Sequence, residues 1–331
     1  MDRDKNFRAL VLDHVDGKLR AEIKSLKIGD LPEGDVVIRV SYSSLNYKDG
    51  LAVTGRGKIV RSYPMIPGID LAGVVESSNS PKFQPGDPVI LTGWEIGEKY
   101  WGGYSQYARA KADWLVPLPR SMELKHAMSI GTAGLTAMLC VMALEEHGFP
   151  TEREVVVTGA GGGVGSIAVA ILSKLGYKVV ASTGRKDLHS YLKDLGAHDI
   201  IDREMLSQDG RPLETQRWGA AVDTVGGKTL AGLLRSLSYR GTVAACGLAG
   251  GSDFCTSVFP FILRGVKLVG VESVVCPVET RIQAWDRLSH LLSGDILDRI
   301  TEVHPLSEVP RLSEEILKGR VRGRIVIDVN A

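Results

Sequence analysis

The sequence predicts an α/β protein made of a β-rich domain and a domain with a parallel, doubly wound sheet. Residues 1–125 contain short apolar runs that Gly and Pro interrupt, with little helical periodicity, which is typical of an all-β module. After residue 125, strongly apolar strands alternate with amphipathic helices, and this alternation indicates a parallel sheet. The 331 residues are enough for two domains of ordinary size.

Composition excludes several classes of protein. Hydrophobic residues make up 44% of the chain and charged residues 24%, as in soluble globular proteins. The net charge is +1 with both signs interspersed, so we expect no nucleic-acid surface, which needs clustered basic residues. The four cysteines form no CxxC pair, and the N-terminal residues lack the apolar stretch of a signal peptide. We therefore expect a cytoplasmic protein.

In the β-rich domain, strands are expected at residues 8–13, 35–46, 71–78, 86–93 and 104–110. Residues 127–144 follow, without a charge, at the short end of the ~17–25 residues that span a membrane. Gly131 and Gly134 dilute this segment and two glutamates follow it directly. We expect a buried helix there and no membrane contact.

The second domain begins with a strand, a Gly-rich turn, a helix and a strand over residues 154–183. A helix over residues 186–196 should end at Gly196. Further strands are expected at 197–202, 219–227, 241–251 and 265–273, and an amphipathic helix near 280–292. The terminal run GRVRGRIVIDV is expected to return as a strand to the first domain. The predicted domains are therefore residues 1–125 with 270–331, and residues 126–269.

The Gly-rich turn, VVVTGAGGGVGS, predicts a dinucleotide site. Gly159, Gly162 and Gly165 stand in the register G-x-x-G-x-x-G, directly after an apolar strand and at the start of a helix. Glycine is needed because the turn is tight and the pyrophosphate must approach bare backbone N–H groups at a helix N-terminus.

The end of the next strand favours NADPH over NADH. An NAD site places an acid there for the ribose hydroxyls, whereas this sequence reads Ser182, Thr183, Gly184, Arg185. Arg185 can clamp a 2′-phosphate and the two hydroxyls can donate to it. The alternative is that Arg185 is only solvated at a helix start.

The motifs SLNYKDG, YPMIPGIDLAGVV, GTAGLTA, TGAGGGVGS and PFILRGVKLVGVES, in this order over nearly the whole chain, resemble the medium-chain dehydrogenase/reductase superfamily. The chain is most similar to its zinc-free, quinone-oxidoreductase-like branch, which includes bacterial NADPH-dependent acrylyl-CoA reductases. The resemblance implies a GroES-like β-barrel catalytic domain, a Rossmann domain that binds NADPH, and a homodimer.

Two departures from the zinc-dependent relatives bear on the chemistry. Where those enzymes read Gly-His-Glu, with the His on a catalytic metal, this chain has Gly68, Ile69 and Asp70. The position of their metal-binding Cys falls within residues 46–49, which contain none. Catalytic zinc needs three protein ligands, so we expect no metal. Asp70 is then interpreted as a structural residue at a strand entry.

The resemblance implies NADPH-dependent reduction of the C=C bond of a short α,β-unsaturated acyl-CoA, acrylyl-CoA to propionyl-CoA. Hydride addition to the β-carbon gives an enolate that one or two hydrogen-bond donors can stabilise, whereas alcohol chemistry relies on a Lewis acid. The alternative enzyme is a quinone or α,β-unsaturated carbonyl reductase. The third hypothesis is that the protein binds NADPH without catalysing a reaction.

Tyr47 is the catalytic candidate, as a donor to the developing oxyanion or, equally, as a packing residue at the nicotinamide. Lys48 and Asp49 are expected to form a local ion pair. By resemblance, an arginine near the end of the chain contacts the cofactor. Arg322 is the expected residue, but Arg320 and Arg324 fit this role equally well. By resemblance, the cofactor contacts are Tyr47, Thr136, Gly162, Gly163, Val164, Ser182, Thr183, Arg185, Leu248, Ile262, Ser273 and Arg322.

Two further groups leave alternatives open. Arg56, Lys58 and Arg61 can hold CoA phosphates or form a solvated basic loop. Trp94 and Trp101 can wall a substrate pocket or serve only in packing.

Overall fold

The computed structural model describes residues 2–331 and divides into two compact units. Unit 1 holds the chain up to Thr132 with Val274–Ser289 and Ser293–Ala331, and unit 2 holds Ala133–Ser273 and His290–Leu292. The first boundary falls inside a long helix, a few residues from the predicted change of domain at residue 125, because helical backbone continues through that point.

Unit 1 is built on β-strands that pair mainly antiparallel. Its larger sheet has the order β14-β15-β3-β4-β5-β7, with β6 also paired to β3, and β1 and β2 form a separate hairpin. The predicted return of the chain terminus is confirmed, because β15 pairs antiparallel with β3. The strands are β1 Asn6–Val15, β2 Lys18–Lys27, β3 Val36–Leu45, β4 Asp70–Ser78, β5 Pro88–Thr92, β6 Tyr107–Ala110, β7 Val116–Pro117, β14 Thr301–Pro305 and β15 Arg324–Asp328.

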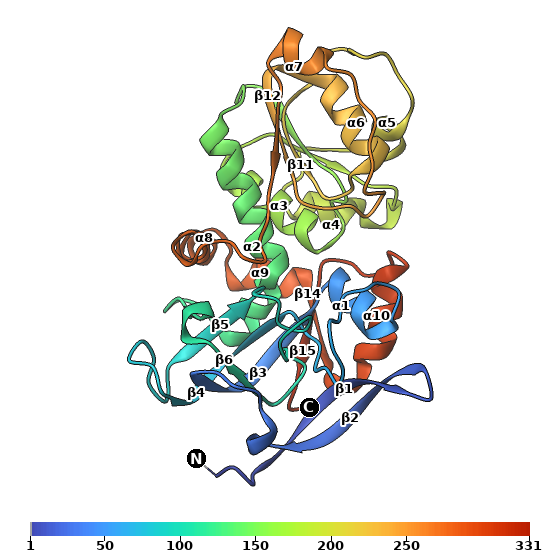
Figure 1. The fold of residues 1–331 in the computed structure, drawn as a ribbon. Coiled ribbons are helices and arrows are strands. Elements are labelled where there is room, and N and C mark those ends of the chain that lie inside the picture. The colour runs from blue at the N-terminus through green and yellow to red at the C-terminus, as the bar shows by residue number, and fades with distance from the viewer. Residues whose placement is uncertain (1) are drawn as a thin grey trace. The chain divides into compact units, whose positions relative to one another are not determined.

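Helices flank these strands. The first, α1, packs against α10 (Figure 1), and the contact is so close that a Cβ on Gly50 would lie 2.8 Å from Ile316 Cγ2. Neither α1 nor the hairpin strand β2 is among the predicted elements. The helical segments of this region are η1 Ile28–Asp30, α1 Tyr47–Thr54, η2 Ala112–Trp114, α8 Val278–Leu291, α9 Gly294–Ile300, η4 Leu306–Glu308 and α10 Val309–Leu317.

Unit 2 contains the predicted parallel sheet, which is confirmed with the order β10-β9-β8-β11-β12-β13. The chain order reverses between β8 and β11, and ligands of doubly wound sheets bind at such a switch point, beyond the carboxyl ends of the strands. The strands are β8 Glu154–Val157, β9 Val179–Ser182, β10 Asp199–Ile201, β11 Trp218–Asp223, β12 Leu237–Ala245 and β13 Lys267–Gly270.

The helices of unit 2 bury apolar faces against this sheet. On α3, Ile167, Ala168 and Ile171 are fully buried, and so are the other residues from Gly165 to Leu172, so this helix is enclosed on all sides. The predicted helix over residues 186–196 forms as η3 and α4, and Gly196 follows it with a φ of 99°. The segments are α3 Gly163–Lys174, η3 Lys186–Leu188, α4 His189–Asp194, α5 Glu204–Ser207, α6 Gly227–Ser236 and α7 Phe259–Arg264.

One helix in the described residues, α2 (Leu124–His147), is long and apolar enough to cross a membrane by length and composition. As much as 83% of its most apolar 18-residue window is buried within the protein, as predicted for a core helix. Its regular geometry is interrupted at Gly131, where φ is 51°.

Candidate active site

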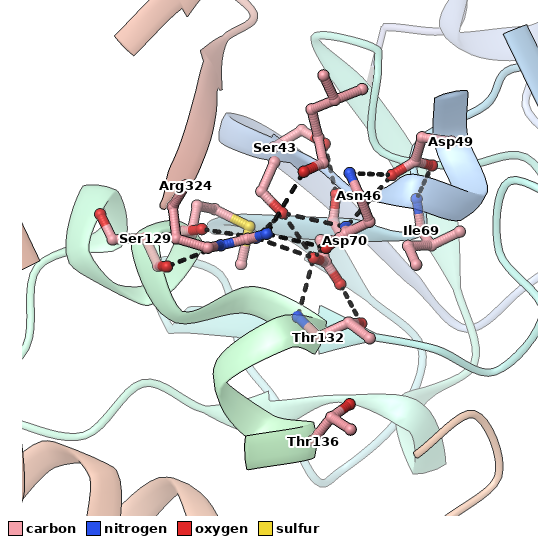
Figure 2. A network of polar contacts seen from close by, with 12 residues as sticks. Ser43, Asn46, Asp49, Ile69, Asp70, Ser129, Thr132, Thr136 and Arg324 are labelled. Atoms are coloured by element: carbon pink, nitrogen blue, oxygen red, sulfur yellow. Dashed lines mark hydrogen bonds and ion pairs between the residues drawn. The ribbon is translucent and has the colours of Figure 1, made fainter. Parts of the chain in front are cut away.

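A cluster of buried polar side chains surrounds Asp70 in unit 1 (Figure 2). Asp70 is the first residue of β4, as predicted for a strand entry, and its carboxylate accepts hydrogen bonds from Ser44 Oγ (2.6 Å) and Asn46 Nδ2 (2.8 Å). Thr132 adds two more, from its backbone N (2.9 Å) and from Oγ1 (2.5 Å). We call this group the Asp70 cluster; its members are Ser44, Asn46, Asp49, Asp70, Thr132 and Arg324.

Arg324, the first residue of β15, supplies the positive charge of the cluster. Its guanidinium donates to Ser44 Oγ (2.8 Å), Asn46 Oδ1 (3.1 Å) and the Ser129 carbonyl (3.0 Å), and it lies 3.9 Å from the Asp70 carboxylate. Burial lowers the pKa of Arg324, and the nearby carboxylates oppose that shift. A buried ion needs this full set of partners, since removing one leaves an uncompensated charge.

Asp49 is the second carboxylate of the cluster. It accepts hydrogen bonds from the backbone N–H groups of Asn46 and Ile69, both at 2.9 Å, and from Asn46 Nδ2 at 3.2 Å. Burial, and next the charge of Asp70, raise the pKa of Asp49 to about 7.

The expected ion pair of Lys48 with Asp49 is wrong. Lys48 pairs with Glu98 at 2.8 Å, while Asp49 points into the protein. The physical reason is that both residues lie in α1, where neighbours along the chain point in different directions.

Gly131 explains why GTAG occurs next to this cluster. Its φ of 51° favours glycine, and a Cβ there would lie 2.6 Å from Asp70 Oδ2, 2.7 Å from Arg324 Nη2 and 2.9 Å from Ser44 Oγ. The interruption of α2 also leaves the N–H of Thr132 available for Asp70.

Tyr47, the first residue of α1, lies at the surface of unit 1 with 45% of its area exposed. Of the two predicted site residues in unit 1, the other, Arg322, lies outside the Asp70 cluster and faces Glu302 at 3.7 Å. Of the three arginines near the end of the chain that the sequence left as candidates, Arg324, at the start of β15, is the one that is buried in this cluster.

In unit 2, the Gly-rich turn joins β8 to α3 as predicted. Gly162 is the N-cap of α3, and Gly163 and Val164 form its first turn, where backbone N–H groups lack helical partners. Gly165 is required by contact, because a Cβ there would lie 2.3 Å from the Gly159 carbonyl oxygen.

Polar side chains join the ends of β8 and β11 at the switch point, and sequence reasoning missed them. Thr158 Oγ1 donates to Asp223 at 2.6 Å, and Thr224 Oγ1 donates to the Thr158 carbonyl at 2.9 Å. Asp223 also accepts the N–H of Gly226 at 2.9 Å, and burial raises the pKa of its carboxyl. The available signal was a polar residue after each of two apolar strands, VVVT and AAVDT.

The predicted phosphate clamp lies at the end of β9. Ser182 and Thr183 are buried, Thr183 Oγ1 accepts the N–H of Arg185 at 3.1 Å, and the Arg185 guanidinium contacts Asp187 at 3.0 Å. Arg203, which sequence reasoning missed, lies beside this turn: a Cβ on Gly184 would be 2.8 Å from its Nε.

Arg203 follows the neighbouring strand β10 and is exposed. Within residues 2–331 its guanidinium has no ion-pair partner. Only the pairing of β9 with β10 brings this arginine to Gly184, so nothing in the local sequence indicated it.

The remaining predicted cofactor residues are all in unit 2. Thr136 Oγ1 donates to Ser273 Oγ at 2.8 Å, so these two residues, far apart in sequence, are brought together. Leu248 follows β12 and Ile262 lies in α7, and both side chains are about two-thirds exposed, at 64% and 68%.

Comparison with known proteins identifies the family. Two family models match: the alcohol dehydrogenase GroES-like domain over residues 32–120 and the zinc-binding dehydrogenase over residues 163–290. The acrylyl-CoA reductase AcuI of Ruegeria pomeroyi is 51% identical over 98% of this chain and 100% of its own length. The chain is a medium-chain dehydrogenase/reductase.

Two further relatives resemble this medium-chain dehydrogenase/reductase as closely. The crystal structure of Escherichia coli K-12 YhdH with bound NADPH has 53% identity, covers 97% of this chain and 100% of its own, and has a TM-score of 0.94. The putative quinone oxidoreductase YhfP of Bacillus subtilis is 48% identical over 97% of this chain and 98% of its own length. Its structure with NAD bound has a TM-score of 0.95.

The zinc that some medium-chain dehydrogenase/reductases carry does not fit the residues of this chain. Ile69 is apolar and fully enclosed, and the nearby Asp49 and Asp70 use their oxygens for hydrogen bonds. In residues 2–331, no three His, Cys, Asp or Glu side chains gather in a way that could hold a metal ion.

A dinucleotide does fit unit 2. Gly165 keeps the turn before α3 free of side chains, and Arg203 presents a charge beside Gly184 at the end of β9. A pyrophosphate is bound by such a helix N-terminus and a 2′-phosphate by such an arginine.

The structure bears on the two groups of residues in unit 1 whose roles the sequence left open, the basic loop after α1 and the tryptophans. Arg56 contacts Glu314 at 2.6 Å, whereas Lys58 and Arg61 are exposed. Trp94 stacks on Trp114, with ring centroids 6.3 Å apart, which favours a packing role for its ring.

Proposed function

We propose that this chain uses NADPH to reduce the C=C bond of a short α,β-unsaturated acyl-CoA, and that its reaction converts acrylyl-CoA to propionyl-CoA. The observation that carries the proposal is the 51% identity, over 98% of this chain and the whole length of the relative, to a protein named acrylyl-CoA reductase. The geometry agrees with it, since unit 2 has a dinucleotide-type turn and unit 1 has an exposed phenol near a buried polar cluster.

NADPH would be held by residues of unit 2 at the carboxyl ends of the strands. Gly162, Gly163 and Val164 would face the pyrophosphate, and Thr183, Arg185 and Arg203 the 2′-phosphate. Thr136, Ser182, Leu248, Ile262 and Ser273 complete the proposed set, with Tyr47 and Arg322 from unit 1. When bound, NADPH supplies the hydride that reduces the substrate.

Tyr47 is proposed as the hydrogen-bond donor of the reaction. Its exposed hydroxyl can donate to the thioester oxygen, on which negative charge develops once the β-carbon is reduced. Conjugate reduction by this route needs no Lewis acid, in keeping with a side-chain set that does not fit zinc.

The CoA moiety is proposed to contact the basic loop after α1. Lys58 and Arg61 are exposed and can attract the CoA phosphates, whereas Arg56 already faces a carboxylate. Reversal of the charge of Lys58 and Arg61 should then raise KM for acrylyl-CoA and leave KM for a small quinone unchanged.

A second candidate function is the reduction of quinones or other α,β-unsaturated carbonyl compounds. It is favoured by the 48% identity to a putative quinone oxidoreductase. A small quinone would use the same donor, since its reduction also places negative charge on a carbonyl oxygen.

Steady-state oxidation of NADPH with acrylyl-CoA, crotonyl-CoA and 1,4-benzoquinone separates these functions. We expect the highest kcat/KM with acrylyl-CoA. Turnover of benzoquinone alone would replace the acyl-CoA proposal with the quinone one. Absence of oxidation with all three, in protein shown to bind NADPH, would leave the non-catalytic reading.

We also propose a cytoplasmic homodimer that contacts neither membranes nor nucleic acid. The edge strand β13 presents unpaired backbone groups on one side, and Val258, Phe259 and Leu263 are exposed apolar residues of the same unit. Light scattering after size exclusion should give twice the mass of the chain; the mass of one chain would refute the dimer.

A further inference from the structure

We propose that Asp49 is the positioning residue for Tyr47: its ionised carboxylate ties the first turn of α1 to the turn before β4 and so holds the Tyr47 side chain in its working orientation. The inference deepens the proposed function, because it rests on Tyr47 as the donor in that reaction.

The helix α1 needs stabilising contacts from outside itself. The helix has only eight residues, Tyr47–Thr54, and helices this short are not stable alone in water. Its N-terminal N–H groups also need acceptors. Asp49 is the third residue of the helix and accepts the Asn46 N–H at 2.9 Å, which forms a capping box.

The Asp49 carboxylate also forms a hydrogen bond to a residue outside the helix. Its other oxygen accepts the N–H of Ile69 at 2.9 Å, twenty residues along the chain and directly before β4. Tyr47 lies on the turn that these bonds hold, between Asn46 and Asp49. Its backbone therefore depends on Asp49, and this backbone sets the direction in which the partly exposed Tyr47 side chain leaves the helix.

Charged and titratable groups from several elements lie around Asp49. Asp70 on β4 is negative and Arg324 on β15 is positive. Burial, and next the charge of Asp49, raise the pKa of Tyr104, in the segment before β6, well above its ordinary value, and its neutral hydroxyl donates to the Ser44 carbonyl at 3.2 Å. On α1 itself, Lys48 is held by Glu98. From α10, the groups that face the next residue of α1, Gly50, are uncharged: Ser313, Ile316 and Leu317.

The Arg324 guanidinium lies 3.9 Å from the Asp70 carboxylate, whereas burial together with the charge of Asp70 raises the pKa of Asp49 to about 7. Below this pH the carboxyl gains a proton and becomes a weaker acceptor for its two backbone N–H groups. The first turn of α1 should then loosen and Tyr47 should lose its orientation. Turnover should consequently rise about tenfold between pH 6 and pH 8, the change in ionised fraction for a pKa near 7.

The test reads Tyr47 directly as well as turnover. Protein labelled with ε-13C-tyrosine is titrated from pH 5.5 to 8.5 without substrate, and the Tyr47 resonance is assigned by its loss in Tyr47→Phe. We expect this resonance to shift with a midpoint near 7 in the native chain, and to show no such midpoint in Asp49→Asn. In the same variant, kcat should fall about tenfold or more and lose its pH dependence, while Kd for NADPH stays within about twofold.

Asp30→Asn is the matched control. Asp30 also accepts a backbone N–H three residues before it, from Lys27 at 2.8 Å, but it is exposed. This variant should keep the native kcat, pH profile and Tyr47 resonance.

A Tyr47 resonance that does not titrate near 7 in the native chain, or an Asp49→Asn variant with the native pH profile, would overturn the proposal. If Asp49→Asn fails to fold, the native titration still decides. A Tyr47 resonance that titrates near pH 7 in a protein that does not turn over acrylyl-CoA would instead contradict the proposed function, while the positioning of Tyr47 by Asp49 would stand.

Discussion

Asp70 is a buried carboxylate that finds its partners within the chain. It is surrounded by hydrogen-bond donors from Ser44, Asn46 and Thr132. Charged hydrogen bonds of this kind are about twice as strong as neutral ones. The negative charge of Asp70 is therefore stabilised by the chain itself.

Replacing Tyr47 by Phe removes the proposed donor and keeps the ring. We expect kcat with acrylyl-CoA to fall by about a hundredfold, the usual effect of losing one oxyanion donor. NADPH affinity, measured by fluorescence titration, should change little. Tyr239→Phe, at a tyrosine of β12 that is 61% exposed, is the control. An unchanged kcat in Tyr47→Phe would make Tyr47 a packing residue.

Arg185 and Arg203 are predicted to select NADPH over NADH. Each forms a charge-assisted bond to the 2′-phosphate in our proposal, and each Ala variant should weaken NADPH binding by about ten- to a hundredfold. Binding of NADH, which lacks that phosphate, should hardly change. Arg211→Ala, at another exposed arginine of unit 2, controls for loss of charge. Equal losses for both cofactors would refute the clamp.

At the scale of elements, Gly165 holds α3 against the turn that follows β8. In Gly165→Ala the new methyl would meet the Gly159 carbonyl oxygen at 2.3 Å and Ala160 Cα at 2.7 Å. Overpacking of this kind costs about 1–3 kcal/mol, so we expect a lower Tm and weaker NADPH binding. Gly270→Ala, which has no atom within 4 Å of its new Cβ, should leave both unchanged. A native Tm in Gly165→Ala would show that the turn can move.

The tie between α1 and β4 has a second, thermodynamic consequence. The pKa of Asp49 is raised in the folded chain, so the folded state binds the proton more tightly than the unfolded state does, and stability is lost as pH rises toward 7. Asp49→Asn removes this loss. Relative to that of the native chain, its free energy of unfolding should be about 2–3 kcal/mol higher at pH 8 than at pH 5, so that the variant is comparatively more stable at the higher pH. Urea unfolding at both pH values measures this; a difference that is independent of pH would contradict it.

Elements made of long apolar runs could be predicted from the sequence. The strand β8 is a continuous apolar run, and α3 is apolar almost throughout, with every residue from Gly165 to Leu172 buried. The short helix α1 was missed because its start depends on Asn46 and on the hydrogen bond that the N–H of Ile69, which is distant in sequence, donates to Asp49. The strand β2 was missed although Leu19, Ala21 and Ile23 alternate with charged residues, which is the period of a half-buried strand. None of its residues is fully buried, and its apolar side chains only partly cover the core.

At the scale of the whole molecule, local motifs located the dinucleotide turn, whereas partners from distant segments had to come from the structure. Arg203 reaches Gly184 only through the pairing of β10 with β9, and Arg324 enters the Asp70 cluster only through the pairing of β15 with β3. The sequence could name Arg320, Arg322 and Arg324 as candidates but had no means of choosing the buried one.

The central claim is that this medium-chain dehydrogenase/reductase adds a hydride from NADPH to the β-carbon of acrylyl-CoA. The most direct measurement uses NADPH dideuterated at C4 with acrylyl-CoA in ordinary water, followed by mass spectrometry and NMR of the product. We predict propionyl-CoA with one deuterium, at C3, and a hydrogen from solvent at C2. Deuterium at C2, or no propionyl-CoA while the protein binds NADPH, would contradict the account.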